Sequence, residues 1–544
     1  MSKPRYRGPL ATATPVGIGA TALQPLARGG HQAFQASSLS HPDLGRWQPY
    51  PGSADSDLLP ELPTIRSRSR DLARNHGVAG SALQTQLDNV LGCGLWLAPT
   101  PDYTLLKRDR KWASAWRRPV KSLWRNWFET NWCDAGKSLT GDALATQMFS
   151  GAFLNGDAVA LPLWLPEAMA PLSTRLQVIE SDRLCNPNFG MDTAQLRGGV
   201  EIDEYGAPIA YHIRKSHPGD TLLYMNGAEF TWERIPVTTA WGRRRVIHAH
   251  NKDRAGQSRG IPALAGVMRQ FKVVGDFQNA QLKSAVVNAM VGLVIESALS
   301  QEGLLDLLSN NSEALAKYTD GLAGRHRAAI DFSGGGMILP IPLGDKVSGF
   351  TPGRPSTADE TFLNTAFTYI AAGLNMPREL LMKDFSNMNY SSARVALMEG
   401  MRFFNGRRNW LALGFYQPCY ELFMEEMVEA GEIEAPGFYE NKAAWCRARW
   451  IGPGRGWVDQ MKEAQAAELR MDIFISSLED ECAEQGKDWE ELLEQIAEEN
   501  ARFKELGLTR NQVVKTLRPK GATDAEYAKP GETADESGAD EVPA

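Results

Sequence analysis

The chain has 544 residues, of which 43% are hydrophobic, 23% are charged and 9% are aromatic. This is a globular composition, and it excludes a collagen-like, purely coiled-coil or fully disordered chain. The formal net charge is −7, whereas proteins that grip duplex DNA along its phosphates are normally basic. The chain therefore either avoids nucleic acid or handles it without holding it.

Residues 1–74 are rich in Gly, Pro, Ser and Ala, and we expect a mostly extended or mobile arm. Lys3, Arg5 and Arg7 precede an apolar stretch that partly mimics a signal peptide, but proline, glycine and threonine dilute it, which favours a disordered tail. The end of the arm carries four arginines, which are either a solvated charge run or contacts to an acidic neighbour: Arg66, Arg68, Arg70 and Arg74.

Residues 75–135 predict helices. Six of the fifteen tryptophans lie between Trp96 and Trp132, interleaved with basic residues. Aromatic and basic side chains together are typical of nucleic-acid contacts. The helical spacing of the tryptophans favours the alternative, an amphipathic helix that buries Trp124, Trp127 and Phe128 while its arginines face water.

Residues 136–250 predict β-structure within an α/β domain. We expect strands at 176–179 and 245–250, and a hairpin over 200–213 that turns at 204–206. His248 and His250 would share one face of their strand. The pattern supplies no third ligand or partner carboxylate, so no metal site and no cofactor are predicted.

A long helix is predicted after Pro262, followed by short strands and loops over 292–350. The segment Thr357–Glu360 has the pattern of a capping box and predicts a second helix that closes at Gly373 and Pro377. The apolar stretch near 286–295 is too short to span a bilayer, so no membrane segment is expected.

The segment 383–392 predicts a polar loop, and a very long helical pattern runs from Ala393 to about Ala430. We expect bends at Gly406, Gly414 and Pro418. Residues 457–508 predict two helices around Gly486, the second capped by Asp488. The end of the chain from Gly521 predicts a disordered acidic tail.

Catalytic motifs are weak. Ala135–Ser138 hints at a phosphate-binding loop, but Asn131 stands where that motif needs a glycine. No GxSxG elbow or HExxH sequence is present. The six cysteines form no CxxC pair, which favours free thiols in a reducing compartment over a disulfide framework or zinc ribbon. The residues alone predict no enzyme.

Four stretches in the same order resemble motifs of one family, the lambda-type portal proteins of tailed bacteriophages. They are the stretch 246–262 (VIHAHNKDRAGQSRGIP), 373–381 (GLNMPRELL), 389–394 (NYSSAR) and 450–463 (WIGPGRGWVDQMKE). In the last, Gln460 replaces the usual proline. Asn155-Gly-Asp157 and the hairpin before residue 213 fit as well. The resemblance covers roughly residues 75–510 and leaves out the arm and the acidic tail.

The resemblance implies an α+β, mostly helical subunit with an α/β wing, an antiparallel helical stem, a small β-containing clip, a long bent helix and a helical crown. Carried over by order, the expected parts are the mobile N-terminal arm (1–74), wing (75–259), stem helix (260–291), clip (292–355), second stem helix (356–376), channel loop (377–395), long bent helix and wing return (396–456), crown (457–510) and disordered acidic tail (511–544).

The resemblance also implies a ring, usually of twelve subunits, at one capsid vertex of the virion, assembled in the host cytoplasm. Double-stranded DNA would pass through it during packaging and ejection. Further expected partners are the terminase motor, the major capsid and scaffold proteins, and a head-completion adaptor. Two alternatives stay open: a minor capsid or adaptor protein without a channel, and a nucleotide-driven packaging enzyme that uses 135–138.

The expected DNA-channel loop residues are Lys383, Asn387, Asn389, Tyr390, Ser391, Ser392 and Arg394. Short polar side chains offer hydrogen bonds, and Lys383 and Arg394 offer transient contacts to phosphates. The same segment also has the pattern of a helix start, with Ser391 or Ser392 as the favoured N-cap. Both roles are compatible.

Overall fold

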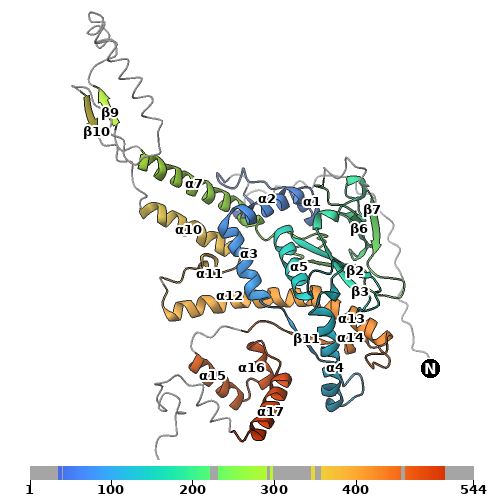
Figure 1. Cartoon of the computed structure of the whole chain (residues 1–544). Helices are drawn as coiled ribbons and strands as arrows, with labels where there is room; N and C mark the ends of the chain where they lie inside the picture. Colours follow the sequence, from blue (N-terminus) through green and yellow to red (C-terminus); the bar gives the residue numbers. More distant parts are fainter. Residues whose placement is uncertain are drawn as a thin grey trace, which may run out of the picture. The chain divides into compact units, whose positions relative to one another are not determined.

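A computed structural model describes residues 35–38, 41–220, 231–290, 294–297, 345–348, 357–386, 388–454 and 460–508. The chain divides after Ser53 into two units, each described by itself. The described part of the first unit holds a short 3-10 helix, Gln35–Ser37. Everything below concerns the second unit, residues 54–544 (Figure 1).

The N-terminal part of this unit is helical, which corrects the prediction of an extended arm for residues 54–74. Helices α1 (Ala54–Leu58) and α2 (Leu62–Asn75) occupy it. The local sequence pattern did not predict these helices, because contacts with distant residues hold α2 in place. Arg66 and Ser69 are buried, and Arg66 pairs with Asp157. Arg66 and Arg70 therefore contact acidic neighbours, while Arg68 is exposed.

The next three helices are α3 (Gly77–Val90), α4 (Arg110–Phe128) and α5 (Gly141–Asn155). The Asp109 side chain begins α4 by accepting from the Trp112 amide at 2.6 Å. Trp124, Trp127 and Phe128 are at most 2% exposed, so the predicted burial of the aromatic face of this helix is confirmed. Trp124 and Trp127 therefore belong to the core, whereas Trp96 is 44% exposed. The expectation that the arginines face water is wrong for Arg117 and Arg125, which pair with Glu490 and Glu491.

Three small antiparallel sheets follow from the alternating segments. One has the order β3 (Thr174–Ile179), β2 (Asp157–Trp164), β8 (Ile247–His250), with Val159 opposite Ile179 on one side and His248 on the other. A second has the order β4 (Leu196–Arg197), β5 (Val200–Ile202), β6 (Pro208–Arg214), β7 (Trp232–Pro236). In the third, β1 (Trp96–Pro99) pairs with β11 (Ala448–Ile451). The predicted strands and the hairpin at 200–213 are confirmed. Short 3-10 turns link these elements at Asn131–Cys133, Ser181–Arg183 and Pro187–Phe189.

The predicted long helix after Pro262 begins with a 3-10 turn, Ala265–Val267, and continues as α7 (Met268–Met290). Helix α10 (Thr357–Gly373) lies beside it (Figure 1). Gly373 lies against Val267, and the rings of Phe362 and Phe277 are 5.1 Å apart, so the two helices run antiparallel.

Between these helices, β9 (Val294–Ser297) and β10 (Asp345–Ser348) form an antiparallel pair. The rest of the predicted clip, 292–355, the predicted capping box at Thr357 and the acidic tail 511–544 lie outside the described residues or side chains.

The next elements are α11 (Arg378–Met382) and α12 (Tyr390–Leu411), then a π-helical segment (Ala412–Tyr416) and α13 (Gln417–Glu429). The predicted bend site at Gly414 lies in the π segment, while Gly406 lies within regular α-helix. Pro418 is the second residue of α13, and it lacks an amide hydrogen to donate to the preceding turn. The hydrogen-bond pattern changes to the π type in the segment just before it.

The remaining helices are α14 (Lys442–Trp445), α15 (Gln460–Asp472), α16 (Leu478–Glu484) and α17 (Trp489–Glu505). Two helices were predicted over 457–508, but the described residues form three. Helix α15 ends at Asp472, and Ser477 then caps a separate helix, α16. Asp488 caps α17 as predicted. The fold is α+β and mostly helical, as expected.

The largest hydrophobic cluster joins α4, α5, β2, β3, the π segment and α13. A second cluster joins α3, α7 and α10. All six cysteines are free, as predicted; four are buried and Cys93 is exposed. Among the described helices, none is both long and apolar enough to cross a membrane.

Candidate functional site

The predicted channel loop begins where α11 ends. Lys383 terminates that helix in the left-handed conformation, with φ of 55°, and its amide donates to the Glu379 carbonyl. Next to it, Asp384 accepts from the Ser386 amide at 3.0 Å and from its hydroxyl at 2.6 Å. The hydroxyl and amide of Ser386 lower the pKa of Asp384, which keeps the carboxylate ionised. The loop thus presents an exposed cation and an exposed anion side by side.

The other end of the loop is the start of α12. The Asn389 side chain accepts from the Ser392 amide at 2.8 Å, so Asn389 is the N-cap and the expectation that a serine caps this helix is wrong. Asparagine caps as well as serine, and it stands three residues before an available amide. Ser391, Ser392 and Arg394 lie exposed in the first turns of the helix.

Two of the predicted loop residues are not placed: Asn387 and the Tyr390 side chain lie outside what the structure describes. Of the seven, the structure brings together Asn389 and Ser392. Lys383 and Arg394 are both exposed, and neither forms an ion pair with the residues that the structure describes. Both cations are therefore available to an anion that comes from outside the described chain.

A buried charge cluster, which the sequence did not predict, lies at the start of β2. Asp157 is fully buried and meets two arginines from distant segments. Arg66 from α2 donates to Asp157 Oδ1 at 2.8 Å, and Arg259 pairs with Oδ2. The two arginine side chains are 5% and 2% exposed. We call Asp157, Arg66, Arg259 and His248 the Asp157 hub.

The ionisation of the hub follows from its geometry. Burial alone would raise the pKa of Asp157, but Arg259 and Arg66 outweigh it and hold that pKa well below its usual range. Burial lowers the pKa of Arg66 to about 10, which leaves it charged near neutral pH. The guanidinium groups also donate to carbonyls: Arg66 to Asn155, and Arg259 to Ser181, Leu184 and Gly198.

The motif segment around Arg259 has a structural role that the sequence alone did not assign. Gln257 accepts from the amides of Asp253 and Arg254 and donates to the Arg259 carbonyl at 2.8 Å, which shapes the turn. Gly260 passes so close to Gly156 that a Cβ would overlap the Gly156 carbonyl oxygen. The stretches 155–157 and 246–262, both singled out by resemblance, thus meet at the hub.

The two histidines of β8 share a face as predicted, with ring centroids 4.3 Å apart. The expectation that they lack a carboxylate partner is wrong, because His248 Nε2 lies 3.2 Å from Asp157 Oδ2. The partner was not visible because it comes from 91 residues earlier in the chain. Burial lowers the pKa of His250 to about 3.

The segment resembling a phosphate loop is already filled by a side chain. Asp134 accepts from the amides of Gly136, Ser138 and Leu139 at 2.9–3.1 Å. Lys137 pairs with Glu167 at 2.7 Å. A nucleotide phosphate would have to displace an ionised carboxylate from these amides, so the geometry disfavours the nucleotide-driven alternative.

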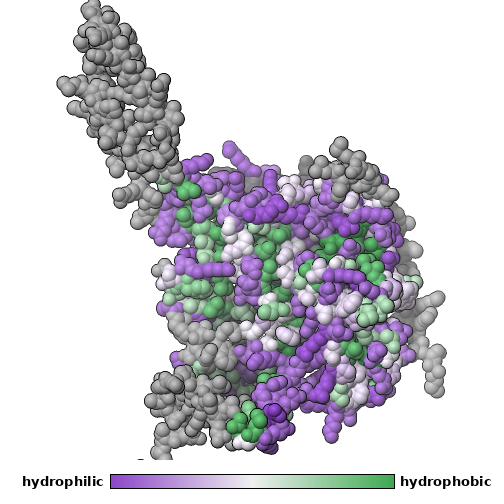
Figure 2. Space-filling model, viewed as in Figure 1, coloured by the Kyte–Doolittle hydropathy of each residue, from purple (hydrophilic) through white to green (hydrophobic). Residues whose placement is uncertain are grey.

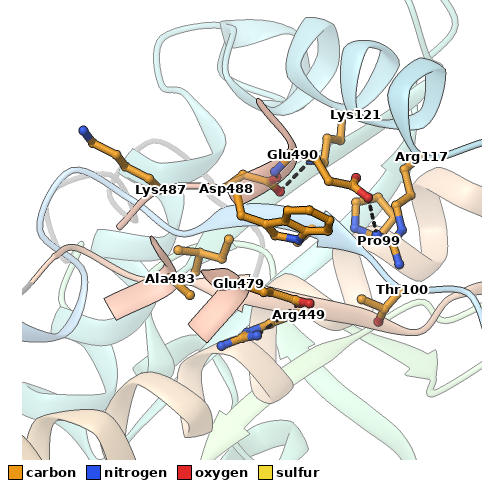
Figure 3. Close-up of a pocket in the computed structure, with 13 residues that line it drawn as sticks. Pro99, Thr100, Arg117, Lys121, Arg449, Glu479, Ala483, Lys487, Asp488 and Glu490 are labelled. Carbon is orange, nitrogen blue, oxygen red and sulfur yellow. Dashed lines mark hydrogen bonds and ion pairs between the residues drawn. The ribbon is translucent and has the colours of Figure 1, made fainter. Parts of the chain in front are cut away.

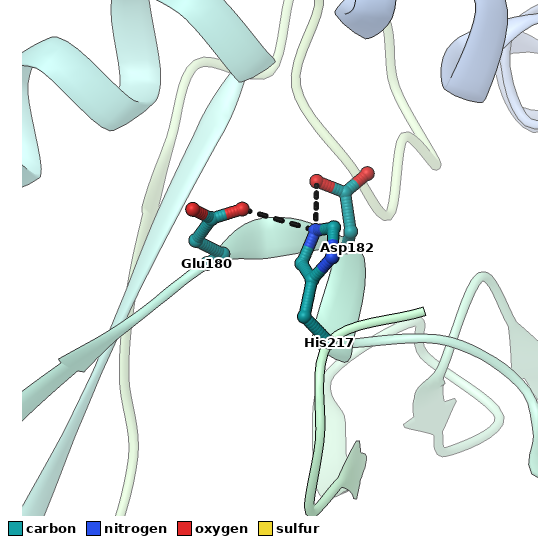
Figure 4. Close-up of side chains that lie close together, drawn as sticks. All are labelled: Glu180, Asp182 and His217. Carbon is teal, nitrogen blue, oxygen red and sulfur yellow. Dashed lines mark ion pairs between the residues drawn. The ribbon is translucent and has the colours of Figure 1, made fainter. Parts of the chain in front are cut away.

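One group with metal-ligand composition was not predicted. Ligand atoms of Glu180, Asp182 and His217 lie within 4.8 Å of one another (Figure 4). His217 Nε2 is 3.0 Å from Glu180 and 3.5 Å from Asp182. Arg70 pairs with Asp182 and lies 3.9 Å from Glu180, so these carboxylates already have a cationic partner.

Comparison with known proteins points to the same family as the four motifs. The family described as phage portal protein, lambda family, matches residues 40–408. The portal protein of Escherichia phage N15 is 31% identical over 86% of this chain and 89% of its own length. Portal protein B of Escherichia phage lambda is 30% identical over 86% of this chain and 88% of its own.

Solved structures give a weaker likeness. A chain of the virion of a native gene transfer agent particle has a TM-score of 0.38 at 14% identity, covering 65% of this chain and 80% of its own. An HK97-family phage portal protein from Corynebacterium diphtheriae has a TM-score of 0.26 at 13% identity, covering 64% and 85%. The identification rests on the sequence relatives.

A mostly helical α+β chain with these four motifs in order is of the class of virion portal subunits, the proteins of the head–tail connector. The chain belongs to the lambda family of phage portal proteins.

Proposed function

We propose that the protein is the portal of a tailed phage: a ring at one capsid vertex through which DNA is packaged and ejected. The observation that carries this proposal is the match to two portal proteins at 30–31% identity over 86% of the chain. The ring would consist of identical copies, twelve in the form that the resemblance implies, joined by heterologous contacts that close.

The negative net charge of the chain supports a channel through which DNA slides rather than a protein that binds DNA tightly. Twelve copies at −7 each give a formal charge of −84, which opposes tight binding of phosphates. The channel loop then needs weak, exchangeable contacts. Lys383 beside the ionised Asp384 offers a contact of this kind, because the neighbouring carboxylate limits its attraction for DNA.

We also propose which described elements form the parts of the subunit. We assign the antiparallel pair α7 and α10 to the stem, the sheets up to β8 to the wing, and α15–α17 to the crown. The β9–β10 pair belongs to the clip, where the terminase motor and the head-completion adaptor would dock. The N-terminal arm would end at residue 53 rather than 74, since α1 and α2 follow.

The portal acts without catalysis in this proposal, in the virion and, during assembly, in the host cytoplasm with the major capsid and scaffold proteins. Electron microscopy of purified protein tests it: closed rings are expected, and protein that stays monomeric at every salt concentration would refute it. Absence of ATP turnover separates it from a packaging enzyme; turnover that Lys137→Ala abolishes would favour the enzyme instead.

A further inference from the structure

The three last helices, α15–α17, have little hydrophobic core of their own. Among their described side chains, Cys482 is buried, whereas α17 has no buried residue. The large hydrophobic clusters of the wing and stem include none of their residues. Figure 2 shows hydrophilic side chains over α17 beside a smaller hydrophobic area. Something other than apolar burial must therefore hold this segment in place.

Ion pairs between α4 and α17 supply the attachment (Figure 3). Successive turns of α4 present cations on one face, and the first turns of α17 present carboxylates to them. The pairs are Arg117–Glu490 at 2.9 Å, Lys121–Asp488 at 2.6 Å, Lys121–Glu491 at 3.4 Å, Arg125–Glu491 at 2.9 Å, and Arg118–Glu494. Arg449 of β11 adds contacts of 3.2 and 3.0 Å to Glu479 and Asp480 of α16.

The centre of this interface is the Lys121–Asp488 pair. The two side chains are only 9% and 11% exposed, so water screens them less than the outer pairs. Asp488 also caps α17 by accepting from the Glu490 amide at 2.9 Å. One carboxylate therefore both begins α17 and binds α4. The cavity beside it, lined by Pro99 and Trp489, has a volume of about 10 Å³, which is room for about one water molecule.

We propose that α15–α17 form a module attached to the wing by an electrostatic latch, which ionic strength opens without unfolding the wing. The argument is that charge pairs dominate the contact, whereas the wing has a large apolar core. Salt shortens the range of exposed charge interactions from about 10 Å at 0.1 M to about 3 Å at 1 M but leaves apolar burial intact. The module would thus be docked or released by its ionic surroundings.

Zero-length carbodiimide cross-linking of the full-length protein, followed by mass spectrometry, tests the latch. The reagent joins an ammonium group to a carboxylate in contact, so Lys121 should be coupled to Asp488 or Glu491 in low salt. We expect a several-fold loss of this product between about 0.1 M and about 1 M NaCl, because salt screens the more exposed pairs Arg118–Glu494 and Arg125–Glu491 and the module then separates from α4. The Lys272–Asp276 pair, 2.9 Å apart within α7, is the internal control, because one helix keeps the two residues four positions apart at any salt concentration.

Charge variants complete the test. Arg125→Glu replaces an attractive pair with Glu491 by a repulsive one, so the yield of the Lys121 cross-link should fall in low salt. The double variant Arg125→Glu with Glu491→Arg exchanges the two charges and should restore the coupling of Lys121 to Asp488. Hydrogen exchange of α5 should stay unchanged in both variants, which shows that the wing is folded. A cross-link yield that does not depend on salt, or that Arg125→Glu leaves unchanged, would overturn the proposal.

Discussion

Replacing Asp157 by Asn tests how much the hub stabilises the wing. The amide keeps the shape of the carboxylate but removes its charge, and it leaves two arginines that are 5% and 2% exposed without their counter-charge. Removing one partner of a buried ion pair costs about 3–5 kcal/mol. Because Arg66 and Arg259 keep their bonds to carbonyl groups, we expect a loss within this range rather than twice as much.

Urea unfolding followed by tryptophan fluorescence, at one fixed protein concentration, measures this loss. The matched control is Glu201→Gln, which breaks a pair with Arg234 at 2.7 Å whose arginine is 50% exposed. An exposed pair contributes at most about 1 kcal/mol. If Asp157→Asn destabilises no more than Glu201→Gln, the hub does not hold the wing together and the reasoning fails.

Three further outcomes follow from the structure. First, burial lowers the pKa of His250 from 6.5 to about 3. As the pH falls below 6.5, the unfolded chain therefore binds a proton at this position before the folded protein does. The folded state loses at most about 1.4 kcal/mol of stability per pH unit between pH 6.5 and pH 3. His250→Asn should flatten this slope in urea titrations at several pH values; a slope that His250→Asn leaves unchanged would contradict the assignment. Second, Gly260→Ala forces backbone apart and should cost about 1–3 kcal/mol in the same assay, while Gly266→Ala, with open space around its Cβ, should change little. Third, Lys383→Ala should alter filling or retention of DNA in a packaging assay while rings still form; normal packaging and retention would contradict the role of the loop.

Local patterns predicted the elements whose cause is local. The alternation of 200–213 with a turn-forming centre gave the hairpin, and the spacing of Trp124 and Trp127 placed them in the core. The cap at Asp488 followed from its position before a helical pattern. In each case the sequence signal lies within a few residues, although Trp124 packs against distant Tyr420 and Phe423.

The elements that were missed depend on distant residues. Helix α2 has few apolar residues, and its buried Arg66 finds its partner 91 residues later in the chain. The Asp157 hub was not predicted for the same reason, because its residues lie far apart in the sequence. Asp157 and Arg259 are 102 residues apart, although both lie in segments already recognised by resemblance. The sequence pattern favoured Ser391 or Ser392 as the cap of α12, whereas the structure has Asn389 in that position. The channel role of Lys383 stays a prediction.

The hub also sets an order of events during synthesis. Asp157 leaves the ribosome 102 residues before Arg259, so at about 5–20 residues per second it waits some 5–20 s for that partner. During this interval the nascent wing holds a carboxylate that burial disfavours until both arginines are in place. The wing should therefore complete its folding only after Arg259 has been synthesised. Helix α2 is made earlier, but its Arg66 pairs with an Asp157 whose burial also needs Arg259.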